Sequence, residues 1–161
     1  MSGSDQELFN LAMSDEARPL LYALKKHIDE NVAPITDEFF ELNEGKEDRW
    51  TWHPRQLELL DGAKKKAKEA GLWNFFLPDA ETGEGLNNLD YAYIATELGK
   101  YALASESLNC SAPDTGNMEV LERVGTPAQK EQWLQPLLDG EIRSAYAMTE
   151  PGVASSDAKN I

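Results

Sequence analysis

Cysteine, histidine and basic residues are scarce in this 161-residue chain, and each shortage excludes a class of protein. The single cysteine, Cys110, cannot form an internal disulfide and suits a reducing compartment. Lysine and arginine total 15 against 29 acidic residues, which gives a net charge of -14. Because nucleic acids and anionic membranes bind cationic side chains, we expect neither as a partner. No paired Cys or His has metal-ligand spacing, so no metal site is expected.

Long apolar runs and the common catalytic loops are also missing. No stretch approaches the ~18 apolar residues that a membrane span requires. Met1–Asn10 has neither the basic start nor the apolar core of a secretion signal. Gly-rich phosphate loops and nucleophile-elbow serines are absent. His27 and His53 are interpreted as structural or solvated, and Cys110 as a small buried side chain. The default expectation is a soluble cytoplasmic protein without a membrane span.

What remains is typical of a globular protein of one domain, or one and a fraction, with 41% hydrophobic residues. In the first helix, apolar residues recur every four positions: Leu20, Leu24, Ile28 and Val32. This spacing puts them on one stripe of a helix. Ser14 is a plausible N-cap, and Pro34 is expected to stop or kink the helix before a second piece that carries Phe39.

Proline, glycine and capping residues divide the rest of the helical sequence. Further helices are expected from Pro54 to Gly71, from an Asn88 cap to Gly99, and from Asp114 to Val124. The side chains expected to point inward on them include Leu57, Leu60, Ala67, Met118, Leu121 and Val124. Thr126, Pro127 and Gln129 form a capping box that starts a last helix, which weakens at Pro136.

The pattern changes near the end of the chain. Ile142–Met148 is short and lies between Gly140 and the Pro151–Gly152 turn, which favours a strand. A lone strand leaves both edges unpaired. The sequence therefore predicts a mainly α fold, an orthogonal or up-down bundle of about six helices over residues 1–140. Residues 141–161 are expected to begin a β domain with its first strand.

Candidate chemistry lies in Tyr146–Asp157, which reads Tyr-Ala-Met-Thr-Glu-Pro-Gly-Val-Ala-Ser-Ser-Asp. A strand that ends in Thr and turns through Pro-Gly offers backbone N–H groups and small hydroxyls without bulky side chains. Such groups suit a flat polar ring system such as an isoalloxazine. Taken alone, these residues are more often an ordinary strand with a capped turn.

The same segment resembles the flavin-contacting signature of acyl-CoA dehydrogenases, aromatic-x-x-T-E-P-G-x-G-S-D. The order of the flanking motifs is also similar to that family: Gly71-Leu72-Trp73 with Leu77-Pro78, residues 125–134, and residues 136–141. Residues 109–119, Asn-Cys-Ser-Ala-Pro-Asp-Thr-Gly-Asn-Met-Glu, are typical of one branch. The resemblance implies a helical N-terminal domain, the start of the middle β domain and a bound FAD.

By that resemblance, five residues are expected to bind the cofactor. Tyr146, Met148 and Thr149 would contact the isoalloxazine. Ser155 and Ser156 would lie near the ribityl-pyrophosphate arm, with Ser156 also touching the acyl-CoA substrate. The spacing before Asp157 is one residue longer than the common motif, which leaves open whether Ala154 or Ser155 takes the place of the second glycine.

The implied reaction is α,β-dehydrogenation of an acyl-CoA thioester to the trans-2-enoyl-CoA, as in fatty acid β-oxidation. A carboxylate removes the α-proton while the β-hydrogen leaves as hydride to the flavin. No catalytic residue is assigned in the chain: the base is expected beyond Ile161, and Glu150 is interpreted as structural. Electron-transfer flavoprotein as acceptor, a homodimer or homotetramer, and a cytoplasmic or, in a eukaryote, mitochondrial or peroxisomal location are also implied. The alternatives are a flavin-dependent acyl-CoA oxidase or monooxygenase on the same fold, and a non-catalytic acidic interaction module.

Overall fold

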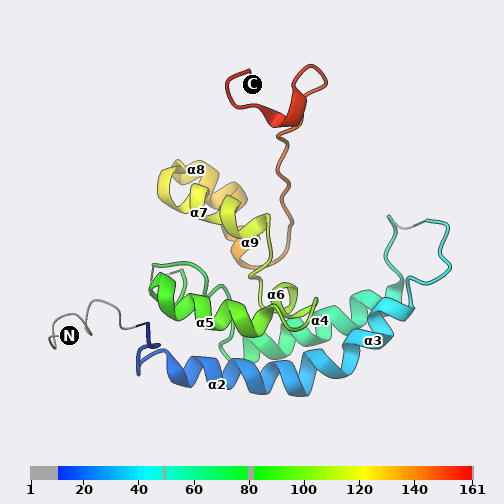
Figure 1. Cartoon of the computed structure of the whole chain (residues 1–161), viewed down its shortest axis with the longest axis vertical. Coiled ribbons are helices and arrows are strands. Elements are labelled where there is room, and N and C mark those ends of the chain that lie inside the picture. The colour runs from blue at the N-terminus through cyan, green and yellow to red at the C-terminus, as the bar shows by residue number, and fades with distance from the viewer. Residues whose placement is uncertain (1–10, 49, 80–81, 161) are drawn as a thin grey trace, which may run out of the picture. The chain divides into compact units, whose positions relative to one another are not determined.

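The structure, a computed structural model, describes residues 11–48, 50–79 and 82–160. The expectation of no secretion signal concerns Met1–Asn10, which lie outside these residues, and the expected base beyond Ile161 lies outside them as well. The described chain divides into two units, one ending at Ser111 and the other beginning at Ala112 (Figure 1). The division expected between residues 140 and 141 stays a prediction. None of the described helices is both long and apolar enough to cross a membrane.

The described residues contain six α-helical segments, so the expectation of a mainly α fold is confirmed. In the first, α2 (Arg18–His27), the π-helical turn η1 (Ile28–Val32) and α3 (Ala33–Glu41) follow one another without a break (Figure 1). Pro34 stands in the first turn of α3, where its missing N–H leaves no carbonyl of α3 itself unpaired. The wider turn η1 just before it adjusts the backbone, so Pro34 does not stop the helix.

Ser14 caps the turn that precedes α2, and not the first turn of α2 itself. Its Oγ accepts a hydrogen bond from the amide of Ala17 at 3.2 Å, and α2 begins at the next residue. The same serine is tied to Asp90, a 3% exposed residue of the helix α5 (Asn88–Leu98). The Ser14 amide and hydroxyl donate to the two Asp90 carboxylate oxygens, each at 2.8 Å. The start of the described chain is therefore fixed to a helix more than 70 residues away.

The helix α4 (Pro54–Glu69) begins at Pro54 and ends before Gly71, as expected. Gly71 has φ +70°, a conformation that glycine adopts without strain. A capping box opens α4: His53 Nδ1 accepts from the Arg55 amide at 3.1 Å, and Gln56 Oε1 accepts from the His53 amide at 3.0 Å. Histidine is an uncommon N-cap, so the sequence pattern did not reveal this role.

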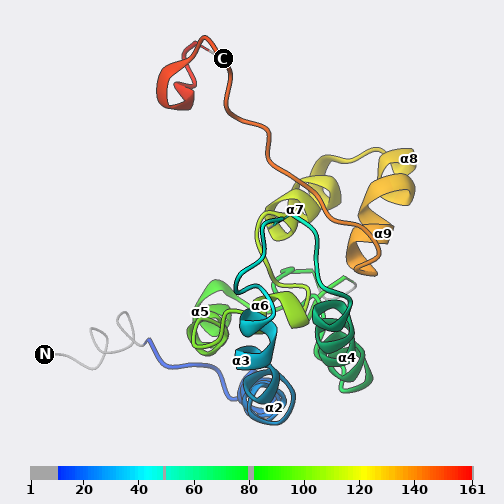
Figure 2. The same ribbon diagram turned by 90° about the vertical axis from the view of Figure 1, so that its right-hand side faces the viewer.

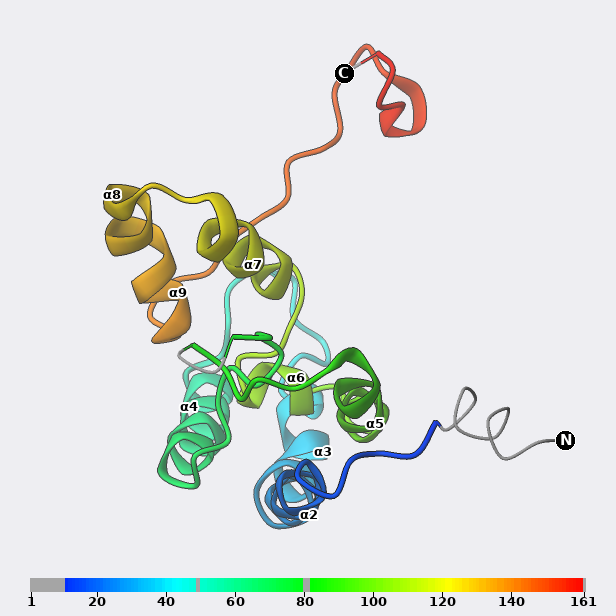
Figure 3. The same ribbon diagram turned by 90° about the vertical axis from the view of Figure 1, so that its left-hand side faces the viewer.

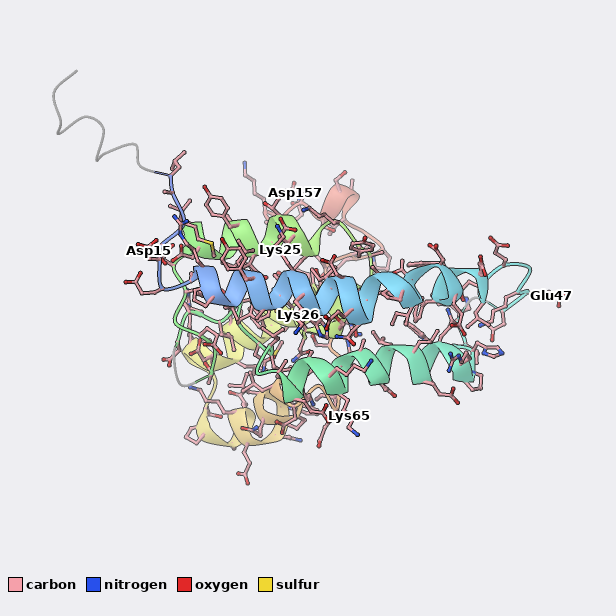
Figure 4. The ribbon with its side chains drawn as sticks, turned by 90° about the horizontal axis from the view of Figure 1, so that it is seen from below. Asp15, Lys25, Lys26, Glu47, Lys65 and Asp157 are labelled. Carbon is pink, nitrogen blue, oxygen red and sulfur yellow. The ribbon has the colours of Figure 1, made fainter. Side chains whose placement is uncertain are left out.

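The expectation that Leu57 points inward is wrong, because its side chain is 46% exposed. The neighbouring Gln56 is buried instead, and its Nε2 donates to the carbonyl oxygen of Phe39 at 2.8 Å. This bond ties α4 to α3. The two helices lie side by side with opposite chain directions, and Glu47 marks the loop that joins them (Figure 4). Lys25 and Lys26 project from α2, and Lys65 from α4 (Figure 4).

In the rest of the first unit, the short helix α6 (Ala104–Ser107) packs against α4 and η1, and Figure 2 shows it between α4 and α5. The cap of α5 is Asn87, one residue before the expected Asn88, and its Oδ1 accepts from the Asp90 amide at 2.9 Å. The core draws its fully buried side chains from α2, η1, α5, the turn over residues 72–77 and the end of α6: Leu24, Val32, Leu72, Phe75, Leu77, Ile94 and Leu108. Cys110 is buried as expected, and burial raises the pKa of its thiol to about 12.

The second unit holds α7 (Asp114–Val124) and a last helix built from α8 (Pro127–Gln129), the π-helical turn η2 (Lys130–Leu134) and α9 (Gln135–Leu138) (Figure 3). The expected capping box of Thr126 and Gln129 is confirmed. The helix does not weaken at Pro136, because η2 precedes this proline as η1 precedes Pro34. Val124 is 76% exposed, so its expected inward position is wrong.

The expected strand at Ile142–Met148 does not form in the described residues. The chain runs away from α9 as an extended segment instead (Figure 2). A strand needs a neighbour whose carbonyls and amides complete its hydrogen bonds. No such neighbour lies in the described part, so this segment is extended but unpaired.

His27, in the last turn of α2, is buried with one ring nitrogen unsatisfied. It is 4% exposed, its Nδ1 lies 3.3 Å from Asn31 Nδ2, and its Nε2 has no hydrogen-bond partner among the described residues. Burial first, and the charge of Lys66 second, lower the pKa of His27. The residue also lines a cavity of about 220 Å³ together with Lys26 and Glu30. Burial and the charge of Lys66 therefore favour the neutral ring.

We expect His27 to make the stability of the protein depend on pH. The unfolded chain gains this proton below about pH 6.5, but the folded chain resists it. The stabilisation is therefore present above that pH and is lost as the pH falls towards the lower pKa of the folded state. The urea midpoint should fall less between pH 8 and pH 5 in His27→Leu than in the parent. Equal losses in the two proteins would contradict this role.

Candidate functional site

The extended segment begins at a buried carboxylate on α7. Asp114, the first residue of that helix, is 3% exposed. Its Oδ1 accepts from the amide of Ser144 at 2.7 Å and from the Ser144 hydroxyl at 2.6 Å. Its Oδ2 accepts from Nε of Arg143 at 2.5 Å. Three donors thus converge on one carboxylate, and we call Asp114, Arg143 and Ser144 the Asp114 clamp.

Asn117 completes the clamp from the next turn of α7. Its Nδ2 donates to Ser144 Oγ at 2.8 Å, while that hydroxyl donates to Asp114. Residues three apart lie on the same face of a helix, so Asp114 and Asn117 reach Ser144 together. The serine is held through its backbone and its side chain at once. Both the position and the rotation of the chain are therefore set where it leaves the helices.

After the clamp, the chain presents free polar groups. Among the described residues, the backbone amides of 145–149 make no hydrogen bond. Tyr146 is 74% exposed, Met148 is 43% exposed, and Thr149 is exposed as well. Because side chains alternate along extended chain, Tyr146 and Met148 share one side and Thr149 lies on the other. This run offers donors along its backbone and apolar groups on one face.

A tight turn follows. The Val153 amide donates to the Glu150 carbonyl oxygen at 3.2 Å and closes the turn through Pro151 and Gly152. The 3₁₀ turn η3 (Ala154–Ser156) comes next, and the Asp157 amide donates to the Ala154 carbonyl oxygen at 3.2 Å. The serines at 155 and 156 therefore follow the extended run but lie in η3, after the turn, and not in the run itself.

These groups fit a flavin chemically. An isoalloxazine needs hydrogen-bond donors along its polar edge and an apolar wall on its face, and its ribityl-pyrophosphate arm needs donors for oxygen. Free amides, a threonine hydroxyl, an aromatic ring and a thioether lie in one run, and two serines follow. No side chain among the described residues covers these groups by a hydrogen bond.

An apolar hollow lies beside the clamp, between α7 and the last helix. Its volume is about 330 Å³. The apolar side chains of its lining are Val120, Leu121, Trp133, Leu137 and Ile142. The polar residues of its lining are Asn117, Arg143 and Ser144. The hollow therefore reaches the start of the extended run.

Comparison with known proteins identifies the family. Residues 14–141 match the model of the acyl-CoA dehydrogenase N-terminal domain. The chain belongs to the acyl-CoA dehydrogenase family. It is 47% identical over 154 residues to mouse acyl-CoA dehydrogenase family member 10, covering 92% of this chain and 14% of that protein. It is 49% identical over 138 residues to human acyl-CoA dehydrogenase family member 11, covering 86% of this chain and 17% of that protein.

A solved structure from Mycobacterium abscessus, described as that of an acyl-CoA dehydrogenase, has the same fold. It superposes with a TM-score of 0.79 at 47% sequence identity, over 92% of this chain and 38% of that one. The expected family and helical fold are therefore confirmed. The chain spans less than a fifth of the length of the mouse and human relatives. The cofactor-binding roles of the five candidate residues in this acyl-CoA dehydrogenase chain stay predictions.

The clamp is the part of the site that sequence reasoning missed. Asp114 and Asn117 belong to the stretch that is typical of one branch of the family, but no pattern linked them to Arg143 and Ser144. The two sets of residues lie about 30 positions apart, as the Ser144–Asp114 separation of 30 shows. The available signals were indirect: a carboxylate at the first helical position, and two polar residues at the start of an apolar strand pattern.

The backbone conformation indicates which residue, Ala154 or Ser155, takes the place of the second glycine of the family motif. Ser155 has φ +55°, a left-handed conformation that costs a residue with a side chain roughly 1–2 kcal/mol. Ala154 is not among the residues with positive φ. Glycine adopts positive φ without this cost, so of Ala154 and Ser155 only Ser155 stands where a glycine would relieve strain, and Ser156, at φ +51°, shares its conformation.

A pair of valine substitutions tests this assignment. Ser155→Val should disturb η3, because a β-branched side chain is strained at positive φ, whereas Ala154→Val and Ser155→Gly should be tolerated. The measurement is hydrogen exchange of the Asp157 amide, which donates to Ala154. Faster exchange is expected in Ser155→Val alone. Faster exchange in Ala154→Val, with Ser155→Val unchanged, would assign the glycine position to Ala154.

Proposed function

We propose that this chain supplies the helical and flavin-contacting part of an FAD-dependent acyl-CoA dehydrogenase, which converts an acyl-CoA thioester to the trans-2-enoyl-CoA. One observation carries the proposal: the run over 145–149 has free amides, starts at a buried anchor and ends at the Glu150–Val153 turn. In a chain of this family, such a run supports a role in which its exposed donors and apolar side chains meet a polar ring.

Each candidate residue has a role in this proposal. The backbone amides of the run and the Thr149 hydroxyl donate to the edge of the isoalloxazine, while Tyr146 and Met148 cover apolar parts of it. The hydroxyls of Ser155 and Ser156 donate to the ribityl-pyrophosphate arm, and Ser156 also reaches the acyl-CoA. FAD supplies the two-electron acceptor for the hydride that leaves the β-carbon.

The run contributes to the chemistry through its fixed dipoles. Preorganised N–H groups stabilise negative charge without having to reorient during the reaction. The α-proton is taken by a carboxylate from outside the described residues, since Glu150 lies at the start of the turn with a structural role. Electron-transfer flavoprotein as acceptor, a homodimer or homotetramer, and a cytoplasmic or, in a eukaryote, mitochondrial or peroxisomal location complete the proposal.

The full-length gene product should carry FAD. We expect a flavin absorption band near about 450 nm that is bleached when an acyl-CoA is added without oxygen. Absence of the band from the intact protein, even after addition of FAD, would contradict the proposal. Rapid return of the band when oxygen is admitted would instead indicate an acyl-CoA oxidase or monooxygenase.

Removal of the Thr149 hydroxyl tests the role of a single residue. Thr149→Val keeps the shape but loses one hydrogen bond, which is worth about 1 kcal/mol, or roughly fivefold in the dissociation constant for FAD. The control is Thr96→Val on α5, whose hydroxyl donates to the Ala92 carbonyl oxygen of its own helix at 2.9 Å. Titration of the full-length apoprotein with FAD should show the loss in the first variant only. Equal affinities in both variants would remove Thr149 from the site.

A further inference from the structure

We propose that Asp114 is a positioning residue for FAD: its carboxylate sets the depth and the rotation at which the run over 145–149 meets the ring. The inference rests on the proposed function, since it concerns the same bound cofactor. Asp114 itself is not exposed and acts only through Ser144 and Arg143.

The geometry of the clamp restricts the chain in two ways. One oxygen of Asp114 receives both the amide and the hydroxyl of Ser144, so the serine cannot rotate about its backbone without losing a bond. The other oxygen receives Arg143 Nε, which fixes the preceding residue. The serine hydroxyl oxygen accepts one further hydrogen bond, from Asn117 Nδ2. The first two residues of the segment are therefore held on the same face of α7.

The restriction extends to the candidate flavin contacts because extended chain has a nearly fixed rise per residue and alternating side-chain directions. At about 3.3 Å per residue, Tyr146 follows Ser144 by roughly 7 Å and Met148 by roughly 13 Å. A slip of one residue would move both side chains to the opposite side. Between the clamp and Thr149, no other hydrogen bond in the described residues holds the run. Among the described residues, the clamp is therefore what anchors the run and sets which side chains and amides face each way.

The charge of Asp114 matters as well as its shape. Asp114→Asn keeps the size of the side chain but replaces one acceptor oxygen with an N–H donor. Whichever way the amide is turned, that donor faces either Arg143 Nε or the donors of Ser144. The variant therefore breaks one half of the clamp without opening a cavity.

The test compares three variants of the full-length protein. Asp114→Asn breaks the clamp, Ser144→Ala removes only the hydroxyl bonds, and Glu131→Gln neutralises an exposed carboxylate of η2 as a control. The measurements are the dissociation constant of FAD from the apoprotein, the absorption spectrum of the bound flavin and its reduction potential. We expect affinity to fall tenfold or more in Asp114→Asn, severalfold in Ser144→Ala and less than twofold in Glu131→Gln. The spectrum and the potential should shift in the first two variants.

Folding is measured separately, by circular dichroism and thermal unfolding of each apoprotein. A merely structural role would lower the melting temperature but leave the affinity and spectrum of the folded protein unchanged, and that result would overturn the proposal. Where Asp114→Asn fails to fold, Ser144→Ala decides, because it keeps the Arg143 bond and the backbone bond. A parent protein that binds no FAD overturns the proposed function and the clamp together. A parent that binds FAD normally, with folded variants that bind it equally well, overturns the clamp alone.

Discussion

The buried carboxylate of Asp114 is the interaction on which the geometry of the candidate site depends. Removing an ion from water costs several kcal/mol, and charge-assisted hydrogen bonds offset that cost only when the donors are well placed. Here three donors come from two adjacent residues, Arg143 and Ser144, so the cost is offset only while the segment is docked. The first residues of the segment are therefore tied to the first turn of α7.

A buried aspartate that binds both the amide and the hydroxyl of a serine also occurs in the other unit. Asp90 lies in the first turn of α5, is buried, and binds the amide and hydroxyl of Ser14. In both cases a serine is held by backbone and side chain together, which fixes the rotation of the chain as well as its position. The partial positive charge at a helix N-terminus favours a carboxylate in the first turn, so this is a suitable place for a buried aspartate.

Local signals predicted the helices well because their physics is local. Pro54, Gly71 and the Thr126 capping box act through residues within one turn, and each marks a helix end in the structure. The errors come from contacts between distant residues. Leu57 is exposed because Gln56 takes the inward position to bond Phe39, which no helical periodicity can show.

The same division applies to the candidate site. A short motif predicted the five candidate residues, but it did not predict the clamp, in which Ser144 binds Asp114 30 positions away. The longer spacing of the motif also has a physical explanation. Ser155 and Ser156 both have positive φ, and the Asp157 amide bonds back to Ala154. A tight turn of this kind advances the chain less per residue than extended chain, which rises about 3.3 Å per residue. The additional residue therefore adds less length to the motif than it would in extended chain.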